Sequence, residues 1–375
     1  MFKILLKASL VPTLLMFLNG CETAQVHLPN PLVASNPRTL DMFLSPRNEQ
    51  CYDRSSQPYT SVVDSHNHFR PFGGNAIPMH DLYDYFRRTG VLFVNAYGIG
   101  QTLPIDSGCE YYLDCPDVEV VPSIRNDFRN ASNYLEHARD DIHLTLSMSF
   151  PDLAEPSEVV PQISLLDREY PKLFTWMGEV NLVKQALFGN GHRAASIDSI
   201  AEWSEFMQIL EDRGIPIAIH ADLGNNNNPT QYRELIEEVL RLYPKNKVVW
   251  VHMGLSAELT NFDAEQHIAI VKSLLDQNPN LMIDISWRVI YDNYLGETKS
   301  RELYVNFLNE YSDRVLPGTD FVALHTKDFQ VYREELEVTS RINLWLDDDA
   351  FRNIALGENY FRLLKLDYRA PQICQ

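Results

Sequence analysis

The sequence predicts an α/β protein in which residues 61–375 form a single (β/α)8 TIM barrel. From residue 61 onward, short apolar runs rich in β-branched residues alternate with stretches of helical periodicity, and eight such runs can be counted. Strands that alternate with helices form parallel sheets through right-handed crossovers. Eight units over about 300 residues match a barrel. A doubly wound open sheet is the main alternative, but no glycine-rich phosphate loop follows the first run.

The eight runs are the expected strands. Most of their starts lie 30 to 35 residues apart, the length of one βα unit, and longer intervals of 50 and 42 residues follow the second and fourth runs. The runs begin near Ser61, Val91, Asp141, Lys172, Gly214, Lys247, Asn280 and Val315.

Amphipathic helices are expected between these strands. Apolar residues recur with the helical period in three long segments, residues 199–214, 229–244 and 264–279. The long interval after the second run carries two cysteines, and we expect this insertion to lie above the face of the barrel that holds the active site.

Composition restricts the class of partner. The chain has 375 residues, 45% of them hydrophobic, which is ample for a large core. Its formal charge of −19 repels phosphate backbones, so the sequence argues against nucleic-acid binding. A small-molecule substrate is expected instead. The oligomeric state is left open, a dimer included.

The N-terminus has the features of a targeting segment. Residues 1–20, the expected signal peptide, contain two lysines and the apolar stretch "LLMFL". The tetrapeptide "LNGC", which ends at Cys21, resembles the lipobox of bacterial lipoproteins. We therefore expect an exported protein, held at the periplasmic side of the cell envelope by lipid on Cys21. An ordinary cleaved signal peptide or an uncleaved anchor is the alternative. Residues 21–60, rich in Pro, Asn and Ser, are expected to form a tether and an N-terminal cover.

Export changes how the other cysteines are interpreted. Four remain, Cys51, Cys109, Cys115 and Cys374, and an even number in an oxidising compartment indicates disulfides. Three pairings are compatible with the sequence. The local pair Cys109–Cys115 is plausible, and it leaves Cys51 and Cys374 to join the two ends of the domain.

Polar residues collect at the carboxyl ends of the expected strands, where barrel enzymes carry their catalytic groups. The first strand ends in "DSHNH", and because side chains at i and i+2 point to the same side, His66 and His68 address one point. Each residue alone has an ordinary structural explanation, such as a buried histidine or a helix cap. Their joint placement favours a divalent metal. The residues concerned are His66, His68, Glu179, His220, Asp222, His252 and Asp320.

The ordered motifs resemble those of the amidohydrolase superfamily. They are "DSHNH" at 64–68, "HAD" at 220–222, "VHMG" at 251–254 and "GTD" at 318–320. The branch that is most similar is the amidohydrolase-2 group, which includes aminocarboxymuconate semialdehyde decarboxylase and dicarboxylate lactonases. The segment "NIALGENYFRLLKL" is similar to the closing helix of that branch.

This resemblance implies a set of site residues. Its metal ligands correspond to His66, His68, His220 and Asp320. His252 matches the histidine that orients or protonates substrate. Glu179 departs from the simplest one-metal pattern and resembles the carboxylate that serves a second ion in TatD-type nucleases. Lys184 is expected in the following loop and not as a carbamylated bridging ligand.

The function expected from these residues is that of a metal-dependent hydrolase. Zn²⁺ is the first choice of ion, with Mn²⁺ or Fe²⁺ as alternatives; one ion is favoured, and Glu179 would serve a second. Asp320 would move the proton of the attacking water, with His252 at the scissile carbonyl of a lactone, amide or ester. Arg288 is a candidate for binding a substrate carboxylate, with a surface ion pair as the alternative.

Three other functions compete with this one. A non-oxidative decarboxylase of an aromatic or dienoic acid would use the same pocket. A nuclease or phosphodiesterase is disfavoured by the acidic charge. A lipoprotein that only binds metal or ligand is disfavoured by the complete ligand set.

Asp64 and Asp222 are candidates for hydrogen-bond partners of the metal-bound histidines.

Overall fold

The computed structural model describes residues 38–44 and 51–374, which belong to one compact unit, Pro31–Gln375. The predicted signal peptide and the lipid site at Cys21 fall outside the described residues. Among the helices of the described residues, none is long and apolar enough to cross a membrane.

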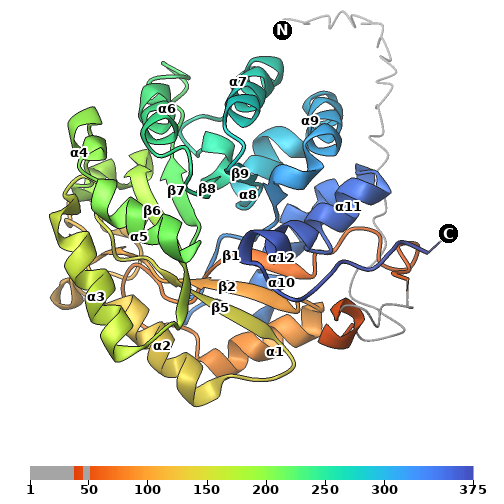
Figure 1. Ribbon diagram of the computed structural model, residues 1–375, viewed down its shortest axis with the longest axis horizontal. Coiled ribbons are helices and arrows are strands. Elements are labelled where there is room, and N and C mark those ends of the chain that lie inside the picture. The colour runs from red at the N-terminus through yellow and green to blue at the C-terminus, as the bar shows by residue number, and fades with distance from the viewer. Residues whose placement is uncertain (1–37, 45–50, 375) are drawn as a thin grey trace, which may run out of the picture. The chain divides into compact units, whose positions relative to one another are not determined.

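The predicted (β/α)8 barrel is confirmed. Nine strands form a parallel sheet in the order β10-β9-β8-β7-β6-β5-β2-β1-β11, and the strands surround the centre of the molecule in Figure 1. Each of the eight expected runs contains a strand. The strands are β1 (Val63–His68), β2 (Phe93–Tyr97), β5 (His143–Met148), β6 (Phe174–Val183), β7 (Ile217–Ala221), β8 (Val248–Trp250), β9 (Leu281–Asp284), β10 (Val315–Leu316) and β11 (Phe321–Val322).

The eighth position of the barrel is shared by two short strands. β10 pairs with β9, whereas β11 pairs with β1, so residues 315–322 close the ring between the last and the first strand. Backbone hydrogen bonds continue across the gap, from Ser65 N to Pro317 O at 3.1 Å and from Asp320 N to His66 O at 2.8 Å. The interruption places Asp320 in the turn between the two strands, directly before β11, at the mouth of the barrel.

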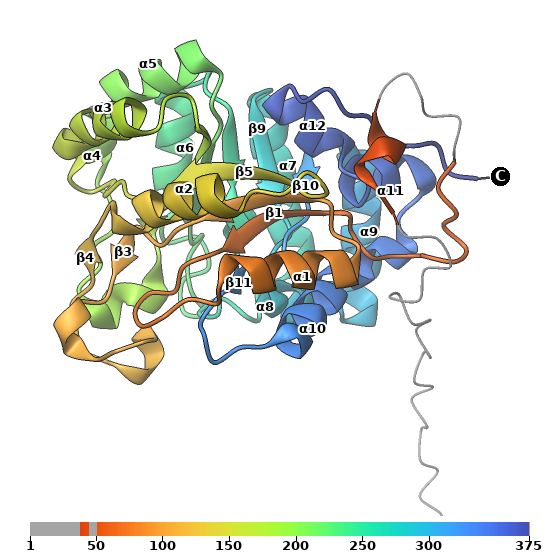
Figure 2. The same cartoon turned by 90° about the horizontal axis from the view of Figure 1, so that it is seen from below.

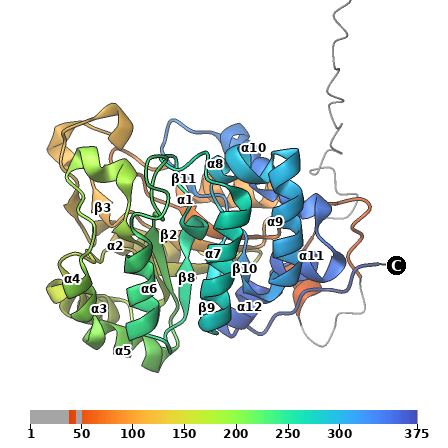
Figure 3. The same ribbon diagram turned by 90° about the horizontal axis from the view of Figure 1, so that it is seen from above.

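Helices cover the outside of the ring, as Figures 1 and 3 show. The expected helical segments 199–214, 229–244 and 264–279 contain α5, α6 and α7, and the last is capped by the side chain of Asp263. The helices are α1 (Met79–Thr89), α2 (Arg125–His137), α3 (Val159–Glu169), α4 (Ile197–Ala201), α5 (Ser204–Arg213), α6 (Arg233–Leu242), α7 (Ala264–Gln277), α8 (Arg288–Ile290), α9 (Thr298–Glu310), α10 (Phe329–Ser340), α11 (Asp348–Ile354) and α12 (Glu358–Leu364).

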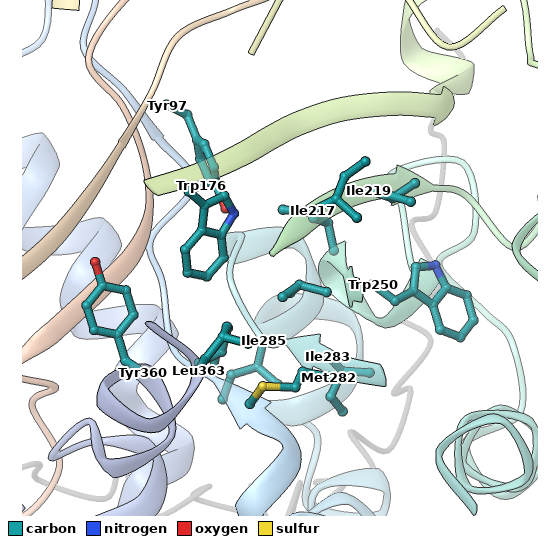
Figure 4. Close-up of a cluster of buried hydrophobic side chains, with 14 of the residues drawn as sticks. Tyr97, Trp176, Ile217, Ile219, Trp250, Met282, Ile283, Ile285, Tyr360 and Leu363 are labelled. Atoms are coloured by element: carbon teal, nitrogen blue, oxygen red, sulfur yellow. The ribbon is translucent and has the colours of Figure 1, made fainter. Parts of the chain in front are cut away.

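The amino-terminal end of the barrel is closed by α12. Tyr360 stacks on Trp176 of β6 with ring centroids 6.1 Å apart, and its hydroxyl shares a 2.5 Å hydrogen bond with Thr145. Figure 4 shows both rings beside Leu363 and the isoleucines of β7 and β9. Both aromatic side chains are fully buried, and truncating such a ring typically costs about 3–5 kcal/mol of stability. This packing of α12 against the strands stabilises the end of the barrel opposite to the site.

Described parts of the N-terminal segment cover the same end of the barrel. Phe43 packs edge-on against Phe93 and Phe361, at centroid distances of 5.3 and 6.0 Å. The predicted disulfide Cys51–Cys374 is present, and it joins this segment to the C-terminal residues that follow α12. In Figure 2 this region lies at the end of the barrel opposite to β3 and β4.

The insertion after β2 lies at the other end, over the carboxyl ends of the strands (Figure 2). It contains a small antiparallel pair, β3 (Gln101–Thr102) with β4 (Val121–Pro122), and the predicted disulfide Cys109–Cys115. Tyr112 of this insertion packs on Phe72 from the loop after β1, with centroids 4.7 Å apart. The insertion thus forms one wall above the barrel mouth, as expected.

Candidate metal centre

Four side chains from three barrel positions converge at the carboxyl ends of the strands. His66 and His68 come from β1, Glu179 from β6, and Asp320 from the turn between β10 and β11. Nε2 of His66 lies 3.2 Å from Nε2 of His68, and each nitrogen lies 3.3 or 3.2 Å from Oδ1 of Asp320. Oε2 of Glu179 lies 3.3 Å from His68 Nε2 and 3.9 Å from His66 Nε2.

These separations fit a metal ion. Two ligand atoms bound tetrahedrally at zinc distances of about 2.0–2.1 Å are about 3.3–3.4 Å apart. All four donor atoms lie within 4.8 Å of one another, and three of the residues are buried. The pair of imidazoles and the pair of carboxylates therefore have the chemistry and the spacing of a divalent metal site.

Hydrogen bonds fix the orientation of both imidazoles. His66 Nδ1 lies 2.9 Å from Oδ2 of Asp284, and His68 Nδ1 lies 2.7 Å from the carbonyl oxygen of Gly98. Because Nδ1 donates a proton to each acceptor, both rings direct Nε2 to the same point, where a metal ion can bind its lone pair. Two lone pairs 3.2 Å apart repel each other unless a cation or a proton lies between them.

Glu179 also belongs to a second group of donors, with His220 and His252. Its Oε1 lies 2.5 Å from His220 Nδ1 and 3.9 Å from His252 Nε2. These contacts place His220 in the second donor group. That His220 binds the same ion as His66, His68 and Asp320 stays a prediction. Glu179 is the residue that the two groups share.

His252 has an unsatisfied nitrogen. Its Nδ1 lies 3.2 Å from the carbonyl oxygen of Ser286 and 3.0 Å from the hydroxyl of the same residue. Nε2 is buried and has no hydrogen-bond partner. A buried polar atom without a partner is costly, so this nitrogen is a candidate for binding substrate or metal.

Asp284 and Ser286, at the end of β9, support two of these histidines, and the sequence analysis did not single them out. Asp284 Oδ1 accepts hydrogen bonds from the backbone N–H of His252 and from the hydroxyl of Ser286, each at 2.8 Å. Its other oxygen binds His66. The signal was present in the sequence, since Asp284 ends an apolar strand just as Asp320 follows one.

The two predicted partners of the histidines have different positions. Asp222 Oδ1 lies 2.8 Å from His220 Nε2, as expected for a carboxylate that orients this ring. Asp64 forms no hydrogen bond or ion pair with an imidazole of the described residues, and it accepts hydrogen bonds from the N–H and hydroxyl of Thr319, both at 2.9 Å. Asp64 therefore fixes the turn that carries Asp320, and Asp284 has the role that was expected for Asp64.

Lys184 lies in the loop after β6, as expected, and its side chain is also part of the site. It follows the last residue of β6 directly, and its side chain returns to Glu179, with Nζ 3.2 Å from Oε1 and 3.3 Å from Oε2. The side chain is only 11% exposed. A buried ammonium therefore neutralises part of the charge of Glu179.

Charges shift the pKa values of the site. Burial lowers the pKa of His68, but its bonds to Asp320 and Glu179 outweigh burial and raise the pKa to about 9. Burial and Lys184 lower the pKa of His220, yet Glu179 and Asp222 raise it to about 9. Burial raises the pKa of Asp320, but the neighbouring histidines lower it to about 2. Asp320 is therefore ionised at neutral pH.

The backbone is strained at several site residues. His252, Met253, Trp287 and Asp320 have φ between 54 and 79°, a region that side-chain-bearing residues rarely adopt. Such conformations cost of order 1–3 kcal/mol each and cluster at functional sites. In Asp320 the conformation turns the carboxylate toward His66 and His68.

Gly178 is required for the position of Glu179. It has φ of 121°, and a Cβ there would lie 2.4 Å from the carbonyl oxygen of Ala218 in β7. Only glycine allows the two strands to approach this closely.

A cavity of about 260 Å³ opens onto the donor groups. Trp287 forms part of its wall and packs against His252 with ring centroids 5.0 Å apart. Three histidines and two valines line this cavity together with aromatic, cationic and acidic residues. The latter are the aromatic residues Phe72, Tyr111, Tyr112, Trp287 and Phe321, the cations Lys184, Arg288 and Lys327, and the acids Asp292, Asp320 and Glu335. The cavity is of a size for a small molecule.

Arg288 lies at this cavity but already has partners. Its Nε lies 3.0 Å from Asp292, and one terminal nitrogen lies 2.7 Å from Glu334. Binding of a substrate carboxylate by Arg288 stays a prediction. Lys327, which the sequence analysis did not single out, forms no ion pair within 4 Å among the described residues, and its Nζ lies 5.1 Å from the ring centre of Phe321.

The amidohydrolase family model (Amidohydro_2) matches residues 177–365, which is 189 of the 375 residues. The chain belongs to the amidohydrolase family. The matched segment includes Glu179, His220, His252 and Asp320, and the barrel adds His66 and His68 to them. The resemblance inferred from the motifs is thus confirmed, and the protein is an enzyme of the amidohydrolase-related type.

Solved amidohydrolase structures share the fold at low sequence identity. One is an amidohydrolase from Burkholderia multivorans with bound zinc, with 12% identity, a TM-score of 0.51, and coverage of 81% of this chain and 99% of that one. Another is a probable 2-pyrone-4,6-dicarboxylic acid hydrolase from Acinetobacter baumannii with bound citric acid, with 13% identity, a TM-score of 0.50, and coverage of 81% and 98%. No curated protein matches the chain.

Proposed function

We propose that this amidohydrolase hydrolyses a C–O or C–N bond of a small molecule, in a lactone, ester or amide, with one Zn²⁺ ion held by His66, His68, Glu179 and Asp320. The observation that carries the proposal is the spacing of their donor atoms, which is 3.2–3.3 Å for four of the pairs. Two nitrogen and two oxygen donors suit zinc, and Mn²⁺ or Fe²⁺ would also accept this set.

A divalent ion in such a site lowers the pKa of a bound water toward about 7 and polarises a carbonyl group. The protein's own residues handle the proton. Asp320 Oδ1 faces the two histidines of β1, whereas Oδ2 lies 4.0 Å from His252 Nε2, on the cavity side. Asp320 is therefore placed to accept a proton at Oδ2 and to return it to a leaving group.

His252, which lines the same cavity, would also act on the substrate. Burial lowers its pKa, so the ring is neutral at physiological pH, with the proton on Nδ1 and a lone pair on Nε2. Nε2 can then accept a proton from a bound group, or donate one after it has been protonated. This role agrees with the expectation that His252 orients or protonates the substrate.

The cations of the cavity suit a substrate with an acidic group. Arg288 is the cation predicted for this role, and Lys327 is a second candidate because it has no ion pair of its own among the described residues. Replacing each in turn by methionine distinguishes them. The variant that raises KM for an acidic substrate, but not for its neutral amide or ester analogue, identifies the binding cation.

The decisive experiment measures turnover on a panel of lactones, esters, amides and phenolic acids, with and without a chelator. We expect hydrolysis products that disappear with the chelator and return with Zn²⁺, and we expect His66→Ala to abolish both metal binding and turnover. Release of CO₂ from a phenolic acid, without hydrolysis of any panel member, would establish a decarboxylase instead. Hydrolysis that is unchanged after metal removal would contradict the proposal.

We also propose that the protein is exported and carries lipid on Cys21, which rests on the "LNGC" motif alone. Mass spectrometry of the protein from its native membrane tests this. The expected N-terminal peptide starts at a diacylated Cys21, and an unmodified Cys21 or cleavage elsewhere would rule the proposal out.

A further inference from the structure

Lys184 occupies the position where a second cation would neutralise Glu179. We propose that the ammonium group of Lys184 replaces the second metal ion, so that the centre binds one ion, and that the group Glu179–His220–His252 is a second metal site which Lys184 keeps closed. This inference rests on the proposed function for the first ion and goes beyond it.

The contacts of Glu179 support this assignment. Lys184 Nζ lies within 3.3 Å of both carboxylate oxygens of Glu179, and Oε1 also lies 2.5 Å from His220 Nδ1. Glu179 is the carboxylate that the two donor groups share, and Lys184 donates hydrogen bonds to both of its oxygens. An ion bound between Glu179 and His220 would have the ammonium as its neighbour.

The second group has the donors of a metal site. His252 Nε2 has no partner, although it is fully buried and lies 3.9 Å from Glu179 Oε1. Asp222 holds His220 from the far side through Nε2. A carboxylate with two oriented imidazoles is a common zinc ligand set. The group Glu179–His220–His252 therefore has the ligands for a metal ion. The positive charge of Lys184 beside it repels such an ion and opposes its binding.

Lys184 supplies the charge that pairs with Glu179. The side chain of Glu179 is only 3% exposed, and Lys184 Nζ lies 3.2 Å from its Oε1. Buried charges are tolerated when they are paired, so removing Lys184 leaves a buried negative charge that a second ion can neutralise.

The test is the number of ions that the purified protein binds. Wild-type protein and the variants Lys184→Met and Lys184→Arg are stripped with a chelator, reloaded with excess Zn²⁺, freed of loose metal by gel filtration and analysed by elemental mass spectrometry. We expect one equivalent per chain for wild type and Lys184→Arg, which keeps the charge, and two for Lys184→Met. Lys327→Met, which removes a cation from the same cavity without touching Glu179, should stay at one.

Loading with Mn²⁺ gives a readout that a merely structural role of Lys184 would not change. Two neighbouring ions are spin-coupled, so Lys184→Met should show a coupled pair in its electron paramagnetic resonance spectrum, and wild type an isolated ion. If Lys184→Met is poorly folded by circular dichroism, Lys184→Gln serves in its place, since it also removes the charge.

The outcomes separate this inference from the proposed function. Two equivalents in wild type, or one in both charge-removing variants, would overturn the role of Lys184 and leave the first metal site intact. No ion in wild type would overturn the proposed function and this inference with it.

Discussion

Asp284 and His66 are joined by a hydrogen bond of 2.9 Å between Oδ2 and Nδ1, although 218 residues separate them in the chain. The carboxylate comes from the seventh strand position of the barrel and the imidazole from the first. This contact fixes the tautomer of His66 that directs Nε2 at the centre. The metal site thus depends on a residue that is not itself one of its expected ligands.

Replacing Asp284 by asparagine should weaken metal binding. The amide cannot supply the charge that supports the His66 ring, and partners of this kind are worth roughly 10–100-fold in metal affinity. Competition with a chromophoric chelator measures the change in Kd. The matched control is Asp292→Asn, which alters an exposed carboxylate near the cavity and should leave the affinity unchanged. Equal affinities for Asp284→Asn and wild type would show that this hydrogen bond does not support the site.

Asp320→Asn should separate metal binding from turnover. The amide can still offer its oxygen at the centre, but it cannot accept a proton, so we expect kcat to fall about 10²–10⁴-fold while most of the metal is retained. Metal content and kcat are measured on the same preparation. Wild-type turnover in a metal-loaded Asp320→Asn would refute the proton-transfer role of this residue.

The stability of the metal-free protein should decrease from pH 6.5 to pH 9. His68 and His220 have an unfolded pKa of 6.5 and a folded pKa of about 9, because carboxylates stabilise their charged forms. Their contribution to stability is therefore fully present below pH 6.5 and is lost as the pH rises through 9. Metal binding displaces such protons, so the loaded protein should lack this loss. Melting temperatures across the range, with and without Zn²⁺, test this, and parallel curves would contradict it.

The two disulfides should have different functions. Cys51–Cys374 spans 323 positions and Cys109–Cys115 spans 6, for which a chain-entropy model gives about 6 and about 2 kcal/mol of stabilisation. The double serine variant of the long-range pair should thus lower the melting temperature more. The double variant of the short pair should mainly raise KM, because this loop carries Tyr111 and Tyr112 into the cavity. The reverse pattern would contradict the assignment.

Much of the barrel could be predicted because its signals are local. Each buried strand is a short apolar run, and the amphipathic helices between them show their period directly. Interruption of the eighth strand at Asp320 could not be predicted. It depends on hydrogen bonds between residues 317–320 and residues 64–66, which are distant in the sequence.

The site was predictable where a side chain ends a strand, as in His66, His68 and His220. The contact of Lys184 with Glu179 was not predicted, because the side chain returns from the loop to the strand before it, which residue spacing does not reveal. Tyr111 and Tyr112 reach the cavity only because the insertion after β2 packs against the loop after β1.

Anomalous X-ray scattering at the zinc absorption edge, from crystals of the zinc-loaded protein, tests the metal centre most directly. The account predicts one strong peak in contact with Nε2 of His66, Nε2 of His68, Glu179 and Asp320. A zinc-loaded, active crystal with no peak between His66 and His68 would contradict it.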